Sequence, residues 1–164
     1  MSELIAETEA RAKEEDVPDA YRAIVAAGWI VDGDARLLAA LHSGYSGTGR
    51  EEFQDVIHYE VTVNGRGMMD YDLPMAGPKR REMLVRRSLG YACTALLAVP
   101  KNWPNTFGYV SLSGGETDDD MLTAHVTFCS EHADTPRYLN DLESYGQEAL
   151  LEIPQTDAAT LLAK

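Results

Sequence analysis

The chain has 164 residues, of which 45% are hydrophobic and 25% charged, a composition that suits one folded domain and excludes a largely disordered chain. Its formal net charge of -13, from 27 acidic and 14 basic residues, repels nucleic-acid phosphates at long range and disfavours a general DNA- or RNA-coating role. The same charge would attract a basic protein partner.

The cysteines and the first residues indicate a cytoplasmic protein with reduced thiols. Cys93 falls in a predicted helix, so a bridge to Cys129 is not expected. The N-terminal stretch MSELIAETEARAKEED is charged throughout and does not resemble a secretory signal. No apolar run approaches the roughly 18 residues that a transmembrane helix needs, so no membrane association is expected.

The first 44 residues or so are predicted to form a helical segment. A polar helix is expected over 2–15, and a second helix begins at Pro18 and ends before Gly28, which is the usual placement of proline and glycine. A third helix is predicted from an N-cap at Asp34 to a C-cap at Gly44. The intervening GWIV is either a short strand or a buried link.

The stretch DVIHYEVTVNGRGMMDYDLP, residues 55–74, is predicted to form a β-hairpin, because β-branched and aromatic residues alternate with polar ones around NGRG. Directly opposed residues of an antiparallel pair lie on the same side of a sheet. The two apolar sets coincide only if the loop has an odd number of residues, so we expect a three-residue loop with a glycine bulge.

A long helix is predicted over 78–99, and its second half is apolar nearly all round, so it should be the buried central helix. A second hairpin is predicted over 106–130, and a closing helix over 135–153. The apolar face of this hairpin comprises Val110, Leu112, Leu122, Ala124, Val126 and Phe128.

The predicted fold is therefore a single α+β domain over residues 1–164. Its order is N-terminal helices, a β-hairpin, a central helix, a second β-hairpin and a C-terminal helix, with an antiparallel sheet packed on the central helix.

The stretch SGGETDDDMLTAHVTFCSEH gathers acids, histidines and a cysteine, but its spacing does not favour a metal site. His125 and Cys129 share one face of a strand and would stand roughly 13 Å apart, too far to bind one ion. Cys129 and His132 have a suitable spacing but supply only two of the four ligands of a structural zinc. No metal or cofactor is therefore expected. The acids of the hairpin tip are kept as a candidate binding patch: Asp118, Asp119 and Asp120.

If both hairpins belong to one sheet, the face opposite the core collects polar side chains. A carboxylate beside an imidazole can orient its proton, as general acid or base catalysis in a small hydrolase-type enzyme requires. The plainer interpretation is the solvated face that antiparallel sheets commonly keep. The candidate catalytic residues are His58, Glu60, Asp70, Asp72 and His125, with Tyr109 and Ser111 beside them.

Five basic residues lie within nine positions at the start of the long helix. Residues seven apart nearly eclipse each other on a helix, so these side chains should form a stripe away from the buried face. The stripe is either a surface for anions, nucleic acid or an acidic partner, or it is paired with acids of neighbouring elements. The candidate binding residues are Lys79, Arg80, Arg86 and Arg87, with Arg81 between them.

Two resemblances accompany these patterns. The stretch GYACTALLAV, through Tyr91, Ala92, Ala95, Leu96 and Leu97, resembles a core helix of phage single-strand annealing proteins, although Gly90 stands where that family has a basic residue. The predicted order of elements is similar to that of class I secretion chaperones, which would imply a protein-binding role. No family is assigned from either.

The sequence favours a non-enzymatic, acidic protein-binding module, such as an inhibitor, an immunity protein or a chaperone-like adaptor, acting on a basic partner. The reasons are the net charge, the lack of a complete catalytic signature and the single small domain. Two alternatives stay open: a hydrolase-type enzyme using the His/carboxylate sheet face, and a nucleic-acid-binding protein using the arginine stripe. The sequence gives no indication of the oligomeric state.

Overall fold

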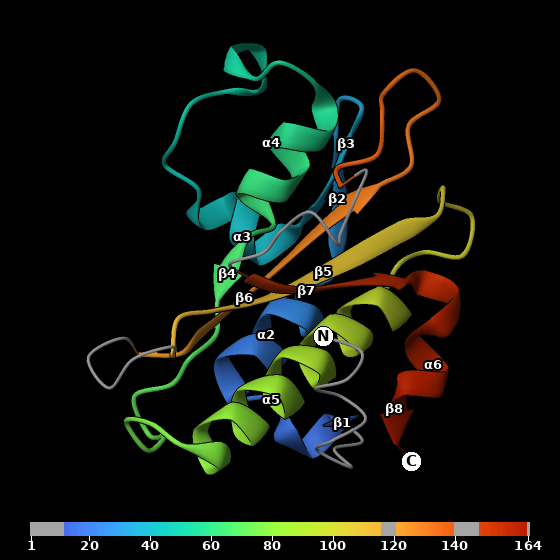
Figure 1. Ribbon diagram of the computed structural model, residues 1–164. Helices are drawn as coiled ribbons and strands as arrows, with labels where there is room; N and C mark the ends of the chain where they lie inside the picture. Colours follow the sequence, from blue (N-terminus) through green and yellow to red (C-terminus); the bar gives the residue numbers. More distant parts are fainter. Residues whose placement is uncertain (1–11, 116–120, 140–147, 164) are drawn as a thin grey trace.

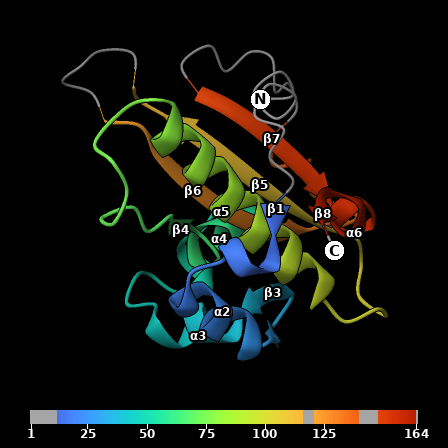
Figure 2. The ribbon, with the colours of Figure 1, turned by 90° about the horizontal axis from the view of Figure 1, so that it is seen from below.

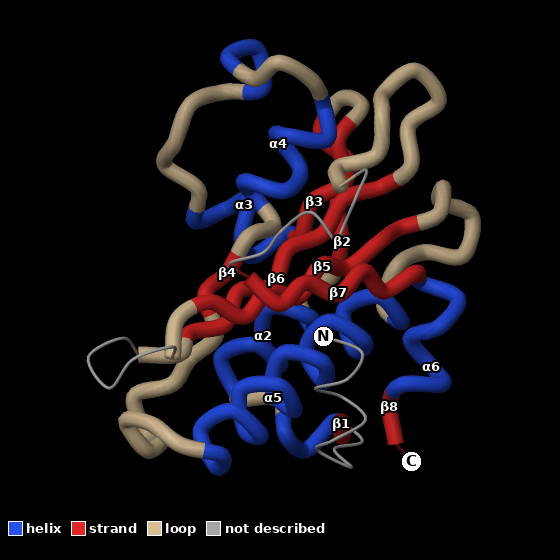
Figure 3. Tube along the Cα trace, viewed as in Figure 1, coloured by secondary structure: helices blue, strands red, loops and turns tan. Residues whose placement is uncertain are grey.

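The computed structural model describes residues 12–115, 121–139 and 148–163. They form a four-stranded antiparallel sheet with helices on both faces, which confirms the α+β class and the packing of the long helix on an antiparallel sheet (Figures 1 and 3). The helices are α2 (Asp19–Ala26), α3 (Ala39–Gly44), α4 (Val56–Val63), α5 (Pro78–Leu97) and α6 (Ala158–Leu161). Short 3₁₀ turns span Glu14–Asp16, Arg50–Glu52 and Gln155–Asp157.

The main sheet has the strand order β4-β6-β5-β7, and each neighbouring pair is antiparallel. The second predicted hairpin is confirmed as β5 and β6, in a register that opposes Ser111 to His125. The strands of this sheet are β4 (Arg66–Gly67), β5 (Thr106–Ser113), β6 (Thr123–Ser130) and β7 (Glu148–Pro154). Two smaller pairs are the hairpin of β2 (Trp29–Asp32) with β3 (Ala35–Leu38), and the parallel pair of β1 (Ala12–Lys13) with β8 (Leu162–Ala163).

Helix α5 covers one face of the sheet and carries the larger core. Figure 2 shows it lying along β5 and β6, and α2 packs beside it. Its second half is buried, as predicted, and a Cβ at Gly108 of β5 would lie only 3.3 Å from Leu96 Cδ1, so this glycine permits close helix-to-sheet packing. The residues of the hairpin that meet α5 are Val110, Leu112, Ala124, Val126 and Phe128.

The other face of the sheet is covered by α4 and the β2–β3 hairpin. The alternate residues of β5 and β6 point to this side, and Phe107, Tyr109 and Cys129 are each at most 5% exposed. This part of the sheet therefore does not have the solvated polar face that the sequence predicted.

Residues 56–63, predicted as the first strand of a hairpin, form α4 instead. Asp55 caps the helix, because its carboxylate accepts the His58 backbone N–H at 2.9 Å. Only His58 and Thr62 are exposed, and their spacing of four residues is helical. Burial of the rest of α4 against the sheet and β3 outweighs the strand preference of valine, isoleucine and tyrosine.

The NGRG stretch is consequently no hairpin loop, and the predicted glycine bulge is wrong. Asn64 ends α4, and its buried side chain accepts the Leu38 N–H at 2.8 Å. The same amide donates to the carbonyls of Arg36 at 3.0 Å and Phe128 at 3.2 Å. Asn64 thus joins β3, α4 and β6, while Arg66–Gly67 alone continues as a strand.

The predicted helix over 34–44 begins later than expected. Gly33 has a φ of 61°, which suits the turn between β2 and β3, and the helix starts only at Ala39. The strand alternative for GWIV is confirmed by β2. The helix expected over 2–15 is wrong at residues 12–15, which are in β1 and a 3₁₀ turn, and the remainder of that prediction lies outside the described residues.

The predicted closing helix over 135–153 is also wrong where the structure describes it. Residues 148–154 form β7, which adds to the outer edge of β5, and Ile153 is buried in the α5 core. Residues 140–147 lie outside the described part. Within the described ranges, no helix is long and apolar enough to span a membrane.

Candidate functional site

The residues predicted for a catalytic sheet face lie on different elements. His58 is exposed on α4 with its Nδ1 2.8 Å from the Asp55 carboxylate, whereas Glu60, two positions on, is fully buried. His125 is exposed on β6, while Asp70 and Asp72 follow β4 and pair with arginines of α5. The structure therefore does not bring these five side chains together.

Arg80 of the predicted basic stripe is inside the protein, with 1% of its side chain exposed. Its guanidinium forms an ion pair with Asp70 and donates to the carbonyls of Leu122 at 2.8 Å and Pro74 at 3.0 Å. The expectation that the stripe faces away from the buried side is therefore wrong at Arg80. The bonds of this arginine hold the chain before α5 against the residue that precedes β6.

Arg86 and Arg87 are also paired within the chain. Arg86 donates to both carboxylate oxygens of Asp16, at 3.1 and 2.8 Å, and Arg87 to both oxygens of Asp72, at 2.8 and 2.6 Å. The bonds from Arg87 lower the pKa of Asp72 to about 2. Lys79 remains exposed, and the predicted patch at 118–120 lies outside the described residues.

Glu60 is the centre of a buried network that the sequence reasoning missed. Its Oε1 accepts the Arg36 N–H and its Oε2 the Ser130 N–H, each at 2.7 Å. His132 Nε2 lies 3.1 Å from Oε1. Burial raises the pKa of Glu60, although the two backbone donors and His132 oppose that shift. The carboxylate thus fastens α4 to β3 and to the end of β6.

A cavity of about 590 Å³ lies beside this network. It is lined by the start of β5, the end of β6 and residues 131–138. Its lining combines aromatic and apolar side chains with a few polar groups. The aromatic and apolar residues include Ile57, Phe107, Tyr109, Cys129 and Tyr138, and the charged or titratable ones include Glu131, His132 and Arg137.

A carboxylate and an aromatic ring hold a guanidinium at this cavity. Tyr109 Oη donates to Glu152 Oε2 at 2.9 Å, and Arg137 Nη1 lies 3.6 Å from Glu152 Oε1. The Arg137 guanidinium also lies over the Phe107 ring, 5.0 Å from its centroid. Glu152 is 16% exposed and Arg137 61% exposed, so a mostly buried acceptor is paired with a loosely held donor.

Cys129 does not have the properties of a nucleophile. Burial raises its pKa to about 12, so the thiol stays protonated at neutral pH, whereas catalysis requires the thiolate. Among the described residues there is also no group of three or more side chains suited to hold a metal ion.

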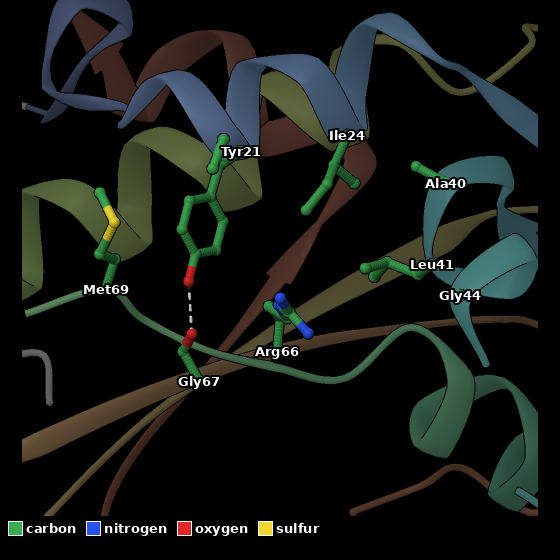
Figure 4. A pocket seen from close by; sticks show the side chains of 9 residues that line it. Tyr21, Ile24, Ala40, Leu41, Gly44, Arg66, Gly67 and Met69 are labelled. Atoms are coloured by element: carbon green, nitrogen blue, oxygen red, sulfur yellow. Dashed lines mark hydrogen bonds between the residues drawn. The ribbon is translucent and has the colours of Figure 1, made fainter. Parts of the chain in front are cut away.

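A second cavity, of about 730 Å³, lies between α2, α3 and β4 (Figure 4). Arg66 is the charged side chain in its lining, which also includes the apolar Ile24, Leu41 and Met69. The Tyr21 hydroxyl points at the Gly67 carbonyl and donates to it, so this group is already used. The charged group of this cavity is thus the positive Arg66, whereas the first cavity lies beside the negative Glu152.

The chain was compared with known protein families, curated proteins and solved structures, and none of the three comparisons gave a match. No family is therefore assigned.

Proposed function

We propose that the protein is a non-enzymatic binding module that binds a basic protein partner on its α4 face. This face is the side of the sheet that α4 covers, with the cavity next to Tyr138. The supporting observation is the pairing of basic side chains with acids of the same chain. Among the described residues, seven basic side chains form ion pairs with carboxylates: Lys13, Arg22, Arg50, Arg80, Arg86, Arg87 and Arg137. These pairs use carboxylates as well as cations, so they leave the net charge of -13 unchanged. The remaining acids outnumber the remaining bases and give the surface an acidic field.

Acidic side chains occur in the cavity lining and in the segments that flank it and α4. Glu131 belongs to the cavity lining, and the exposed Asp134 follows it by three residues. The exposed Glu51 and Glu52 precede α4, whose His58 ring lies 6.4 Å from the Tyr138 ring of the cavity. Complementary charge of this kind steers a basic partner to one face and raises its association rate.

The two alternative functions have less support. The hydrolase-type alternative needs His58 and His125 close to Glu60, Asp70 or Asp72. These residues lie on different elements, and α4 places His58 and Glu60 on opposite sides of a helix. The nucleic-acid alternative needs free arginines on α5, and Arg80, Arg86 and Arg87 are bonded to carboxylates.

A charge-matched pull-down from the native host tests the proposal. One bait carries Glu51→Gln, Glu52→Gln and Asp134→Asn on the α4 face, and the control bait carries Glu14→Gln, Glu15→Gln and Asp157→Asn elsewhere. We expect the wild type and the control to retain one basic protein in stoichiometric amount at low salt, and the α4-face variant to lose it. Retention by all three baits, or binding that does not change with salt, would contradict the proposal.

A further inference from the structure

We propose that the cavity beside Phe107 and Glu152 is the seat of an arginine side chain of the basic partner, and that Arg137 occupies part of this seat in the free protein. The inference rests on the proposed function and specifies the chemical group that the site would take.

The proposed arginine site already holds one guanidinium, that of Arg137. The Phe107 face lies 5.0 Å from Arg137 Cζ, and Glu152 lies 3.6 Å from its Nη1. Tyr109 donates a hydrogen bond of 2.9 Å to Glu152, so the carboxylate has a contact that does not involve Arg137. A planar guanidinium stacks on an aromatic ring and donates to a carboxylate together, which a lysine ammonium cannot do equally well.

Because of the unequal burial of the pair, displacement of Arg137 has a small free-energy cost. Arg137 is 61% exposed, and an exposed ion pair contributes little. Glu152 is only 16% exposed and, among the described residues, would keep the Tyr109 hydroxyl as its partner, and an incoming guanidinium would replace the lost contact.

The surroundings of the seat also favour a cation. Glu131 lies in the lining, and the exposed Asp134 is close to it in the chain. His132 also belongs to the lining, and its Nε2 lies 3.1 Å from Oε1 of Glu60. The volume of about 590 Å³ leaves room beyond the part that Arg137 fills.

The probe is a synthetic acetylated peptide of alternating glycine and arginine, compared with the same peptide in which neutral citrulline replaces arginine. Calorimetry gives the affinity, and the aromatic NMR resonances of Phe107, Tyr109 and Tyr138 report the site. We expect the arginine peptide to shift these resonances and to bind at least about tenfold more tightly than the citrulline peptide, because the charge is needed for both contacts. Equal binding of the two peptides, or no binding of either, would overturn the inference.

Arg137→Ala gives the sharpest result, because it predicts a gain. Removal of the internal occupant should strengthen binding of the arginine peptide by about threefold to tenfold, a range set by an exposed cation–π contact. The control Arg81→Ala removes the same charge from an exposed position of α5 and should change the affinity by less than about twofold. Weaker binding of the Arg137 variant, or an equal gain in the Arg81 variant, would overturn the inference.

Two further variants remove the seat itself. Glu152→Gln keeps an acceptor for Tyr109 but removes the charge, and Phe107→Leu keeps an apolar side chain but removes the ring; each should weaken binding by about tenfold. Binding that these variants leave unchanged, but that the Glu51, Glu52 and Asp134 variant loses, would reject the seat while leaving the proposed function intact. The pull-down decides the proposed function separately.

Discussion

Two buried polar side chains, Glu60 and Asn64, hold α4 in place. Glu60 accepts two backbone N–H groups, from β3 and β6, and Asn64 bonds to backbone groups of the same two strands. Buried polar groups of this kind stabilise a fold only when their partners are present, and each group left without a partner costs about 1 to 3 kcal/mol. These two side chains therefore provide the hydrogen bonds that join α4 to the backbones of β3 and β6.

Replacement of Asn64 tests this role. In Asn64→Ala the Leu38 N–H and the carbonyls of Arg36 and Phe128 lose a partner in a buried position, so the free energy of unfolding should fall by about 2 to 4 kcal/mol. Urea denaturation measures the loss. The control Asn102→Ala changes an exposed residue and should have an effect within about 0.5 kcal/mol. A similar loss in both variants would contradict the role of Asn64.

The ion pair of Asp72 with Arg87 makes a prediction about pH. The pKa of Asp72 is lowered from an ordinary value of 3.8 to about 2 by the Arg87 hydrogen bonds. A lowered pKa means that the pair stabilises the folded state fully above pH 3.8 and that this contribution is lost as the pH falls from about 4 to about 2. Because 46% of the Asp72 side chain is exposed, the contribution is small.

Carboxyl ¹³C NMR measures this titration directly. The Asp72 resonance should titrate with a midpoint near 2, and the variant Arg87→Gln should move the midpoint up toward 3.8. In denaturation experiments, Asp72→Asn should lose less stability than the wild type between pH 4 and pH 2. An Asp72 midpoint of 3.8 in the wild type would be inconsistent with the pair.

At the scale of elements, α5 and the β5–β6 hairpin were predictable, whereas α4 was not. Helix α5 has a proline at its first position and an apolar second half, and β5 and β6 have alternating apolar residues. In these elements the local sequence preference and the final structure agree. In α4, the valines, isoleucine and tyrosine favour a strand, and the packing of both flanks overrides that preference. The helical signal was present but short: Asp55 as cap and two exposed positions, His58 and Thr62, four residues apart.

The β2–β3 turn can be tested with a pair of glycine variants. Gly33 has a φ of 61°, so Gly33→Ala should lower the free energy of unfolding by about 1 to 2 kcal/mol. Gly44 at the end of α3 has an ordinary φ and open space around its Cα, so Gly44→Ala should be neutral or stabilising by up to about 1 kcal/mol. Thermal denaturation compares them, and equal effects would argue against the turn.

At the scale of the whole molecule, the class of the fold followed from the sequence, but the composition of the site did not. Glu60 was predicted to be exposed on a strand, and it is buried under a helix because the second face of the sheet is covered. His132 and Arg137 were not predicted, because their approach to Glu60 and Glu152 depends on how the chain turns after β6 and where β7 adds. Contacts between residues so distant in the chain leave no local pattern.

The β5–β6 hairpin separates two tasks through its alternating sides. Phe107, Tyr109 and Cys129 line the cavity, whereas Val110 and Phe128 pack against α5, and no side chain in the described part of the hairpin does both. Lineages of this protein could therefore exchange the lining, residue by residue, without disturbing the principal scaffold. A domain arranged in this way can change the lining of one cavity while its architecture persists.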